Sequence, residues 1–181
     1  NASGTGVGDI KVVDPFTWAS LNNLSLNSNN DITINGAISS TNFAGVGVLG
    51  SITMNAGRNI ILNGAINTNS GAVVLNANGT ITLNSAITTN DSSASVTLTP
   101  SFATTNGILF NAGAGVTTTG TAGQTYNALN TTIASGASIT LNAANGNITF
   151  AGAIDGPGNL TITSNGTINV NSGHIGTNTA L

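Results

Sequence analysis

The sequence predicts an all-β protein: a right-handed parallel β-helix (β-solenoid) of about seven coils, each with roughly 21 residues and three short strands. Three observations favour this fold: a recurring phrase, a strict alternation of apolar and polar residues, and a shortage of helix-forming residues. Copies of the phrase begin at Leu24, Ser51, Ala72, Ser138 and Leu160. Each copy has two alternating segments separated by an Asn/Gly turn, and most continue into a third segment built on Gly-Ala-Ile.

The spacing of the copies indicates a stack of coils. Equivalent positions of the first segments recur at intervals of about 21 to 23 residues, within the range of solenoid repeats. These positions are Ile52, Val73 and Val96, followed by Ile139 and Leu160. The second segments follow in step, with Ile60 before Ile81 and Ile148 before Ile168.

Within a segment the residues alternate between two faces. Ile81 and Leu83 point to one side and Thr82 to the other, so one face is apolar and the other polar. Stacking is predicted to place equivalent aliphatic residues in buried columns. One column contains Ile32, Ile60 and Ile81, and the next contains Ile34, Leu62 and Leu83.

Helix and antiparallel sandwich are the alternatives to this fold. The sequence has no Glu and few other straight-chain helix formers, while Thr, Ile and Val are abundant and Gly or Asn interrupts every short segment. An antiparallel sandwich shares the alternation but needs no fixed triplet of strands. The recurring triplet therefore favours the β-helix.

Asparagine recurs where the segments end. Its left-handed backbone tolerance suits corners, and its amide is able to hydrogen-bond to the equivalent amide one coil away, so we expect a structural role. The first segments end in Asn27, Asn55, Asn76 and Asn142, and the second in Asn35, Asn63, Asn84 and Asn111.

The repeat is interrupted in two places. Residues 99–138 are predicted to form an irregular or lengthened coil, with Gln124, Tyr126 and Leu129 inside it. Near the start, Phe16 and Trp18 lie beside Pro15, and we expect Trp18 to pack as a large core residue rather than as an exposed sugar platform. We interpret residues 1–181 as a single β-helix segment, an interior fragment of a longer repetitive protein.

Composition restricts the function classes. Charged residues make up 4% of the 181 residues, and Lys11 and Arg58 are the only bases, so nucleic acid is not expected as a partner. Cysteine is absent, which leaves no disulfide scaffold or thiolate metal site and is compatible with export. No apolar run reaches the length of a membrane span, and no signal segment opens the chain.

An enzymatic β-helix would need convergent carboxylates, often with Arg, Lys or calcium. The acids are spread along the sequence: Asp9, Asp14, Asp31, Asp91 and Asp155. Asp31 and Arg58 fall one coil apart and are expected to form an exposed ion pair, while His174 is expected to be a solvated strand-end residue. We therefore predict no enzyme and no catalytic, cofactor-binding or metal site, and no cofactor.

Threonine pairs suggest a further alternative, ice binding. Thr80 with Thr82, and Thr161 with Thr163, match the Thr-x-Thr motif of flat β-helical ice-binding faces. The coils beside Thr82 offer Ile61 and Leu109 instead, so the array is interrupted. Several Asn-x-Ser/Thr triplets, such as those at Asn78 and Asn165, are frequent by chance in this composition.

Several phrases carry a resemblance to a known family. They are Leu24-Ser-Leu-Asn with Asp31-Ile-Thr-Ile-Asn-Gly-Ala-Ile, the lead-in Phe16-Thr-Trp18, and Gly123-Gln-Thr-Tyr126-Asn before Asn147-Ile-Thr-Phe150. Together they resemble the filamentous haemagglutinin family of two-partner secretion adhesins. The Asn-Pro-Asn-Gly signature of that family's secretion domain is absent, so the chain resembles shaft repeats.

The resemblance implies a structural or adhesive segment of a secreted or cell-surface bacterial protein that mediates attachment or builds filaments. It implies an outer-membrane transporter during export, and glycans or proteins of host or neighbouring cells as partners. The architecture adds end-to-end self-association, because both ends of a β-helix fragment expose strand edges. The alternatives are an ice-binding or phage-fibre-like β-helix and, less favoured, a polysaccharide-degrading enzyme.

Overall fold

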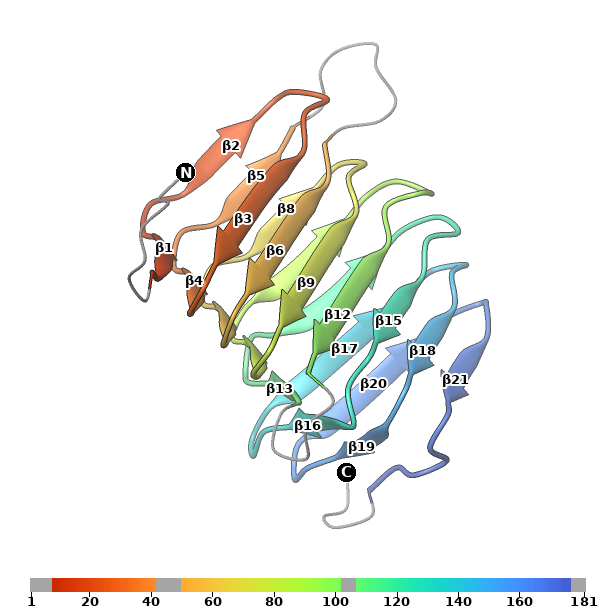
Figure 1. Ribbon diagram of the computed structural model, residues 1–181. Helices are drawn as coiled ribbons and strands as arrows, with labels where there is room; N and C mark the ends of the chain where they lie inside the picture. The colour runs from red at the N-terminus through yellow and green to blue at the C-terminus, as the bar shows by residue number, and fades with distance from the viewer. Residues whose placement is uncertain (1–7, 42–49, 102–106, 177–181) are drawn as a thin grey trace.

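The structure is a computed structural model that describes residues 8–41, 50–101 and 107–176. These residues form 21 β-strands, and no helix among them is long and apolar enough to cross a membrane. The strands build three parallel sheets of seven strands each, arranged around one hydrophobic core (Figure 1). The predicted all-β class is confirmed.

Each sheet takes every third strand of the chain. Sheet A contains β1 (Ile10–Val12), β4 (Ile32–Ile34), β7 (Ile60–Leu62), β10 (Ile81–Leu83), β13 (Ile108–Phe110), β16 (Asn130–Ile133) and β19 (Ala153–Asp155). Sheet B contains β2 (Phe16–Trp18), β5 (Ile38–Ser40), β8 (Ile66–Thr68), β11 (Ala86–Thr89), β14 (Gly115–Thr118), β17 (Ser138–Asn142) and β20 (Asn159–Thr163). Sheet C contains β3 (Leu24–Ser28), β6 (Ile52–Ala56), β9 (Val73–Ala77), β12 (Val96–Pro100), β15 (Gln124–Tyr126), β18 (Ile148–Phe150) and β21 (Ile168–Val170).

The chain visits the sheets in the order A, B, C, so one strand from each makes a coil. Six turns lead from β1 to β19, and β20 and β21 continue the stack. This arrangement is the parallel β-helix with three strands per coil that the repeats predict. Coil length varies more than expected: Ile52 pairs with Val73, 21 residues on, but Leu24 pairs with Ile52, 28 residues on. More residues separate β5, which ends at Ser40, from β6, which begins at Ile52, than separate β8 from β9.

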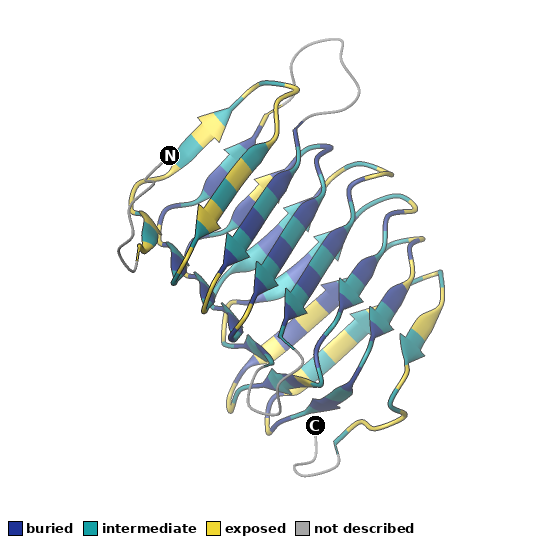
Figure 2. Cartoon of the chain, in the orientation of Figure 1, coloured by how far each residue is buried: buried dark blue, intermediate teal, exposed yellow. Residues whose placement is uncertain are grey.

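Aliphatic side chains stack in columns inside the helix, as predicted. Ile32 pairs with Ile60, and Ile60 with Ile81, and none of the three has exposed surface. The second predicted column is also present and fully buried, and contains Ile34, Leu62 and Leu83. Each such burial stabilises the fold by about 1.5–3 kcal/mol. Figure 2 shows the alternation as stripes of buried and intermediate residues across the sheets.

The copy of the phrase that begins at Ser138 lies in a different sheet from the earlier copies. Sequence spacing places Ile139 in the same strand position as Ile52, and this prediction is wrong. Ile139 belongs to β17, which pairs with β14 and β20 in sheet B, whereas Ile52 lies in sheet C. The cause is two added strands. After β14 the chain forms β15 and β16 before the phrase begins again in β17, and two strands are less than a whole coil. The first strand of the phrase therefore moves from sheet C to sheet B.

A buried polar network lies beside this change of phase. Gln124 interrupts an aliphatic column of sheet C, between Val96 and Ile148, and is 1% exposed. Its Nε2 donates to the carbonyl oxygens of Val116 at 3.1 Å and Asn142 at 2.7 Å, both in sheet B. These bonds lie next to the point where the pairing of β14 with β17 ends. The side chain thus spans the core and gives two carbonyls a donor.

Tyr126 completes the network. Its hydroxyl donates to Gln124 Oε1 at 2.7 Å, and burial raises the pKa of this fully buried phenol well above its usual value. The Tyr126 ring stacks on Phe150 with centroids 4.7 Å apart and meets the edge of Phe110 at 5.9 Å. Two of these three aromatic core residues, Phe110 and Tyr126, therefore lie in the stretch predicted to be irregular.

A second buried polar feature is a column of threonines at the corner between sheets B and C. Thr68, Thr89 and Thr118 are at most 1% exposed. Each hydroxyl donates to a carbonyl of the corner that follows it, on Gly71, Ala94 and Ala122 respectively. These hydroxyls satisfy backbone groups inside the corner, so these threonines are not part of the polar outer surface.

Candidate functional site

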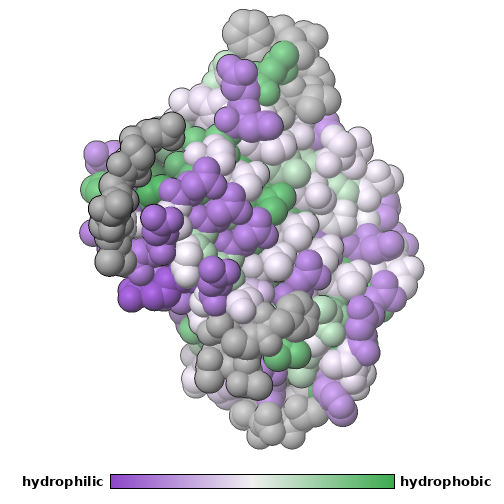
Figure 3. Space-filling view, viewed as in Figure 1, coloured by the Kyte–Doolittle hydropathy of each residue, from purple (hydrophilic) through white to green (hydrophobic). Residues whose placement is uncertain are grey.

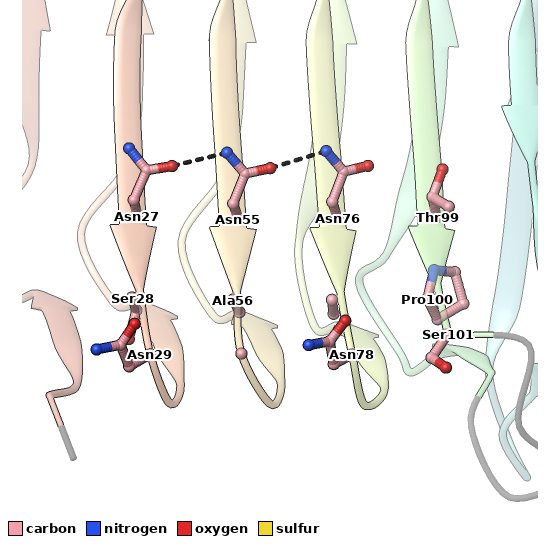
Figure 4. A pocket seen from close by; sticks show the side chains of 12 residues that line it. Asn27, Ser28, Asn29, Asn55, Ala56, Asn76, Asn78, Thr99, Pro100 and Ser101 are labelled. Carbon is pink, nitrogen blue, oxygen red and sulfur yellow. Dashed lines mark hydrogen bonds between the residues drawn. The ribbon is translucent and has the colours of Figure 1, made fainter.

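A row of asparagine side chains runs along the outer face of sheet C. Asn55 Nδ2 donates to Asn27 Oδ1 at 2.7 Å, and Asn76 Nδ2 donates to Asn55 Oδ1 at 2.9 Å (Figure 4). The three residues share one register position in β3, β6 and β9. A carboxamide has two N–H donors and two lone pairs on its oxygen, so Asn55 keeps one donor and one acceptor outside the row.

A second asparagine row follows the strands of sheet A. The Nδ2–Oδ1 distances are 2.8 Å from Asn63 to Asn35, 2.7 Å from Asn84 to Asn63, and 2.6 Å from Asn111 to Asn84. The prediction that these amides bond from coil to coil is confirmed for both rows. Asn142 is an exception: its Oδ1 accepts from the Ala144 backbone, and its register partners are threonines.

The other reason given for these asparagines, a left-handed backbone, is wrong. Among the described residues, Ala144 is the only one besides glycine with a positive φ, at 40°. The recurrence of Asn therefore reflects side-chain hydrogen bonding along the stack rather than backbone conformation at the corners.

A groove of about 600 Å³ lies beside the first asparagine row and crosses β3, β6, β9 and β12. One side is formed by Asn27, Asn55, Asn76 and Thr99, and the floor by Ser28, Ala56, Ala77 and Pro100. The other side is formed by Asn29, Gly57, Asn78 and Ser101. The surface sinks here because the floor residues are small. Hydrophilic side chains gather over β3, β6 and β9 on this face (Figure 3).

The predicted pair of Asp31 and Arg58 is present at the corner that precedes sheet A. Arg58 Nε donates to Asp31 Oδ1 at 3.0 Å, and Arg58 Nη2 bonds to Oδ2. Arg58 holds the pKa of the Asp31 carboxyl below its usual value, so Asp31 is ionised at neutral pH and unsuited to be a general acid. Asp31 Oδ1 also accepts the backbone N–H of Asn59 at 3.0 Å.

Asp9 lies one coil before Asp31, because the strands that follow the two residues pair with each other, Ile10 with Ile32. Asp9 Oδ1 accepts the backbone N–H of Asp31 at 3.2 Å, and Asn59 Oδ1 accepts that of Thr80 at 2.9 Å. These side chains thus repeat one task along the stack, since each caps an N–H of the next coil. The signal for this role is present in the sequence, because Asp9, Asp31 and Asn59 each immediately precede a strand of sheet A.

The remaining charged and titratable residues do not join this corner. Asp14 is exposed, and Asp91 accepts hydrogen bonds from the backbone and hydroxyl of Ser93, which lower the pKa of its carboxyl. His174 is exposed, and its backbone oxygen accepts from Ile154. Within residues 8–41, 50–101 and 107–176, no three His or Asp side chains lie close enough to hold a metal ion.

The threonine arrays are interrupted as expected. Thr82 lies between Ile61 and Leu109 in register, and Thr163 pairs with Asn142. No continuous Thr-x-Thr face extends through the sheet around Thr82, so the structure offers ice binding no support.

Trp18 packs against the core, as predicted, but at its edge. It is half-buried, and its ring meets Phe16 at a centroid distance of 6.0 Å. Its indole nitrogen is buried without a hydrogen-bond partner among the described residues. Of the Asn-x-Thr positions named above, Asn78 is exposed beside the groove, and Asn165 Nδ2 donates to Asn145 Oδ1 at 3.0 Å.

The fold and the surface define a class: a repetitive β-solenoid whose outer faces are polar and almost uncharged. A comparison with protein-family models matches the hemagglutinin repeat over residues 39–174, about three quarters of the chain. The chain therefore belongs to the hemagglutinin repeat family and is an adhesin-type β-helix segment. Searches of curated proteins and of solved structures returned no match. Family and fold together indicate a structural segment rather than an enzyme, and the family is in general one of secreted or cell-surface adhesins.

Proposed function

We propose that this chain forms part of the shaft of a secreted or cell-surface bacterial adhesin that mediates attachment or builds filaments. The observation that carries the proposal is the hemagglutinin repeat over residues 39–174, which coincides with the stacked coils of the β-helix. Export through an outer-membrane transporter belongs to the same proposal. Glycans or proteins of host or neighbouring cells are its proposed partners.

The physical properties of the stack support a shaft. With a rise of about 4.8 Å per coil, the six steps between the seven strands of a sheet span about 30 Å. Buried columns and asparagine rows run along the axis, so bending the rod would open many contacts at once. The low charge makes such a rod insensitive to salt.

Surface location is tested by labelling intact cells that produce the natural protein. Antibodies raised against residues 1–181 are expected to bind intact cells or the culture fluid, and external protease is expected to remove the cell-bound signal. Labelling that appears only after cell lysis would contradict the proposal.

The spacer role is tested separately from direct receptor binding. Deleting this segment from its natural protein is expected to reduce attachment, and replacing it with an unrelated β-helix of equal coil number is expected to restore it. If the replacement fails to restore attachment, the segment itself binds the target surface.

Self-association is a further part of the proposal. The outer edges of β1, β2 and β3 have no strand partner within the described residues, and such edges favour pairing with another chain. Light scattering of the 181-residue chain is expected to show growth in mass with concentration. A constant monomer mass at high concentration would oppose it.

A further inference from the structure

We propose that the groove across β3, β6, β9 and β12 binds a neutral, linear glycan along the axis of the rod. The inference deepens the adhesive function proposed above and rests on it for its biological meaning. It assigns a binding site to the shaft itself rather than to another part of the adhesin.

The groove is built as a repeated polar wall beside a smooth floor. Its floor consists of small side chains, and Ala56 and Ala77 are 6% and 5% exposed. Gly57 leaves an opening in the far wall between Asn29 and Asn78, because it has no side chain. A Cβ atom at Gly57 would lie 2.2 Å from the backbone oxygen of Asn29, so the close stacking of the coils itself requires glycine there.

The hydrogen-bonding groups of the groove match hydroxyl groups. Asn55 uses one donor and one acceptor within its row, and the other N–H and lone pair are available to a ligand. Asn76 uses only Nδ2 within the row. A sugar hydroxyl both donates and accepts, so it is able to bond to either half of such an amide.

The direction of the groove favours a polymer with a regular repeat. The wall positions of β3, β6, β9 and β12 follow one another at the strand spacing of about 4.8 Å. A linear polymer of sugar units presents its own hydroxyls at regular intervals and is able to contact several coils at once. A compact ligand would use only one or two of the four coils.

Charge and backbone pairing exclude two other polymers. None of the lining residues is charged, and Arg58, next to Gly57, bonds to Asp31, so the groove offers an anionic polymer no free cation. An extended peptide binds a sheet by pairing along an open strand edge. Of the four strands that the groove crosses, only β3 has such an edge within the described part of the chain, and the groove runs across the strands rather than along that edge. A neutral glycan needs neither feature. The groove has no aromatic platform among its lining residues, so we expect weak binding per site.

The test is nuclear magnetic resonance titration of the 181-residue chain with hexasaccharides of cellulose, chitin, amylose and β-1,3-glucan. Their neutral backbones differ in linkage, and a heparin hexasaccharide serves as the anionic comparison. At least one neutral probe is expected to shift the side-chain amide signals of Asn55 and Asn76. No shift with any neutral probe at millimolar concentration, or shifts with heparin alone, would overturn the inference.

Matched variants locate the site. In Asn55→Thr the new residue is threonine, which the protein already has at the same register position in Thr99. The variant is expected to bind the glycan about tenfold more weakly, because one or two hydrogen bonds to the ligand are lost. Asn63→Thr breaks the second asparagine row in the same way but lies outside the groove, and it is expected to bind normally. Equal weakening by both variants would refute the groove. Failure of the glycan titration would leave the surface-labelling result standing, so the two proposals fail separately.

Discussion

Replacing Gln124 by isoleucine tests whether the buried polar network holds the core together where the repeat changes phase. Isoleucine is the residue of the same column one coil on, at Ile148, so its size suits the site. The change removes the donor to Val116 and Asn142 and leaves the Tyr126 hydroxyl without its acceptor. Each buried group that loses its partner costs about 1–3 kcal/mol.

The net loss is smaller than the sum of these terms. Burying the added aliphatic surface returns about 1–2 kcal/mol, and each carbonyl has a second lone pair that softens its loss. We therefore expect the free energy of unfolding to fall by about 2–5 kcal/mol, a large share of the 5–15 kcal/mol that is usual for a folded domain. Urea unfolding followed by circular dichroism measures this difference.

Two further variants separate hydrogen bonding from packing. Adding Tyr126→Phe to Gln124→Ile removes the unpaired hydroxyl and is expected to recover about 1 kcal/mol, although Tyr126→Phe alone destabilises the protein. Ile148→Val, one coil away, is expected to cost only about 0.5–1.5 kcal/mol. If Gln124→Ile proved as stable as the unchanged protein, the network would have no stabilising role and the reasoning would be refuted.

Three other predictions concern the core and the titrating groups. Ile81→Asp puts an unpaired charge in a dry column and is expected to cost at least about 4 kcal/mol in urea unfolding, whereas Thr82→Ser is expected to be nearly neutral; equal losses would contradict the register. Tyr126 is the only tyrosine, and because burial raises its pKa, stability is expected to fall as pH rises above about 10, with the ultraviolet absorbance of tyrosinate appearing only on unfolding. Arg58 lowers the pKa of Asp31, so Asp31 stabilises the fold above the unfolded pKa of about 3.9 and loses this effect as pH falls through the folded value. Asp31→Asn is expected to reduce the acid dependence of Tm, and an unchanged dependence would speak against the pair.

The columns of Ile32, Ile60 and Ile81 were predictable because two regularities agree on them. Alternation decides which residues face inward, and the repeat decides which inward residues meet. The same logic predicted both asparagine rows and the contact between Asp31 and Arg58. Wherever neighbouring copies follow one another directly, sequence distance is a reliable guide to spatial position.

The strand position of Ile139 was not predictable in this way. Comparing copies of a phrase shows that two segments are alike, but not how many strands separate them around the coil. Strands β15 and β16 are three and four residues long and match no part of the phrase, so they carry no period of their own. Their presence is evident only in the structure, from the pairing of β15 with β12 and β18 and of β16 with β13 and β19.

The buried threonines were not predicted, for a different reason. Thr68 and Thr89 lie two residues after Ile66 and Ile87, at positions that alternation places inside, yet their polarity suggests the outer face. Their hydroxyls satisfy corner carbonyls, an energetic term that hydrophobic patterning does not include. A recurrence of Ser or Thr two residues after the isoleucine of the third segment, as at Ser40, Thr68 and Thr89, was the available signal.

The two-strand insertion also acts as a rotation of the surface about the long axis of the rod. Before the insertion, Asn76 ends the first strand of the phrase and lies on sheet C. After the insertion, the equivalent residue, Asn142, lies on the neighbouring sheet B. A third inserted strand would have returned the pattern to its first face. The number of strands inserted between two copies therefore decides on which of the three sheet faces a surface motif lies, and the motif itself does not change.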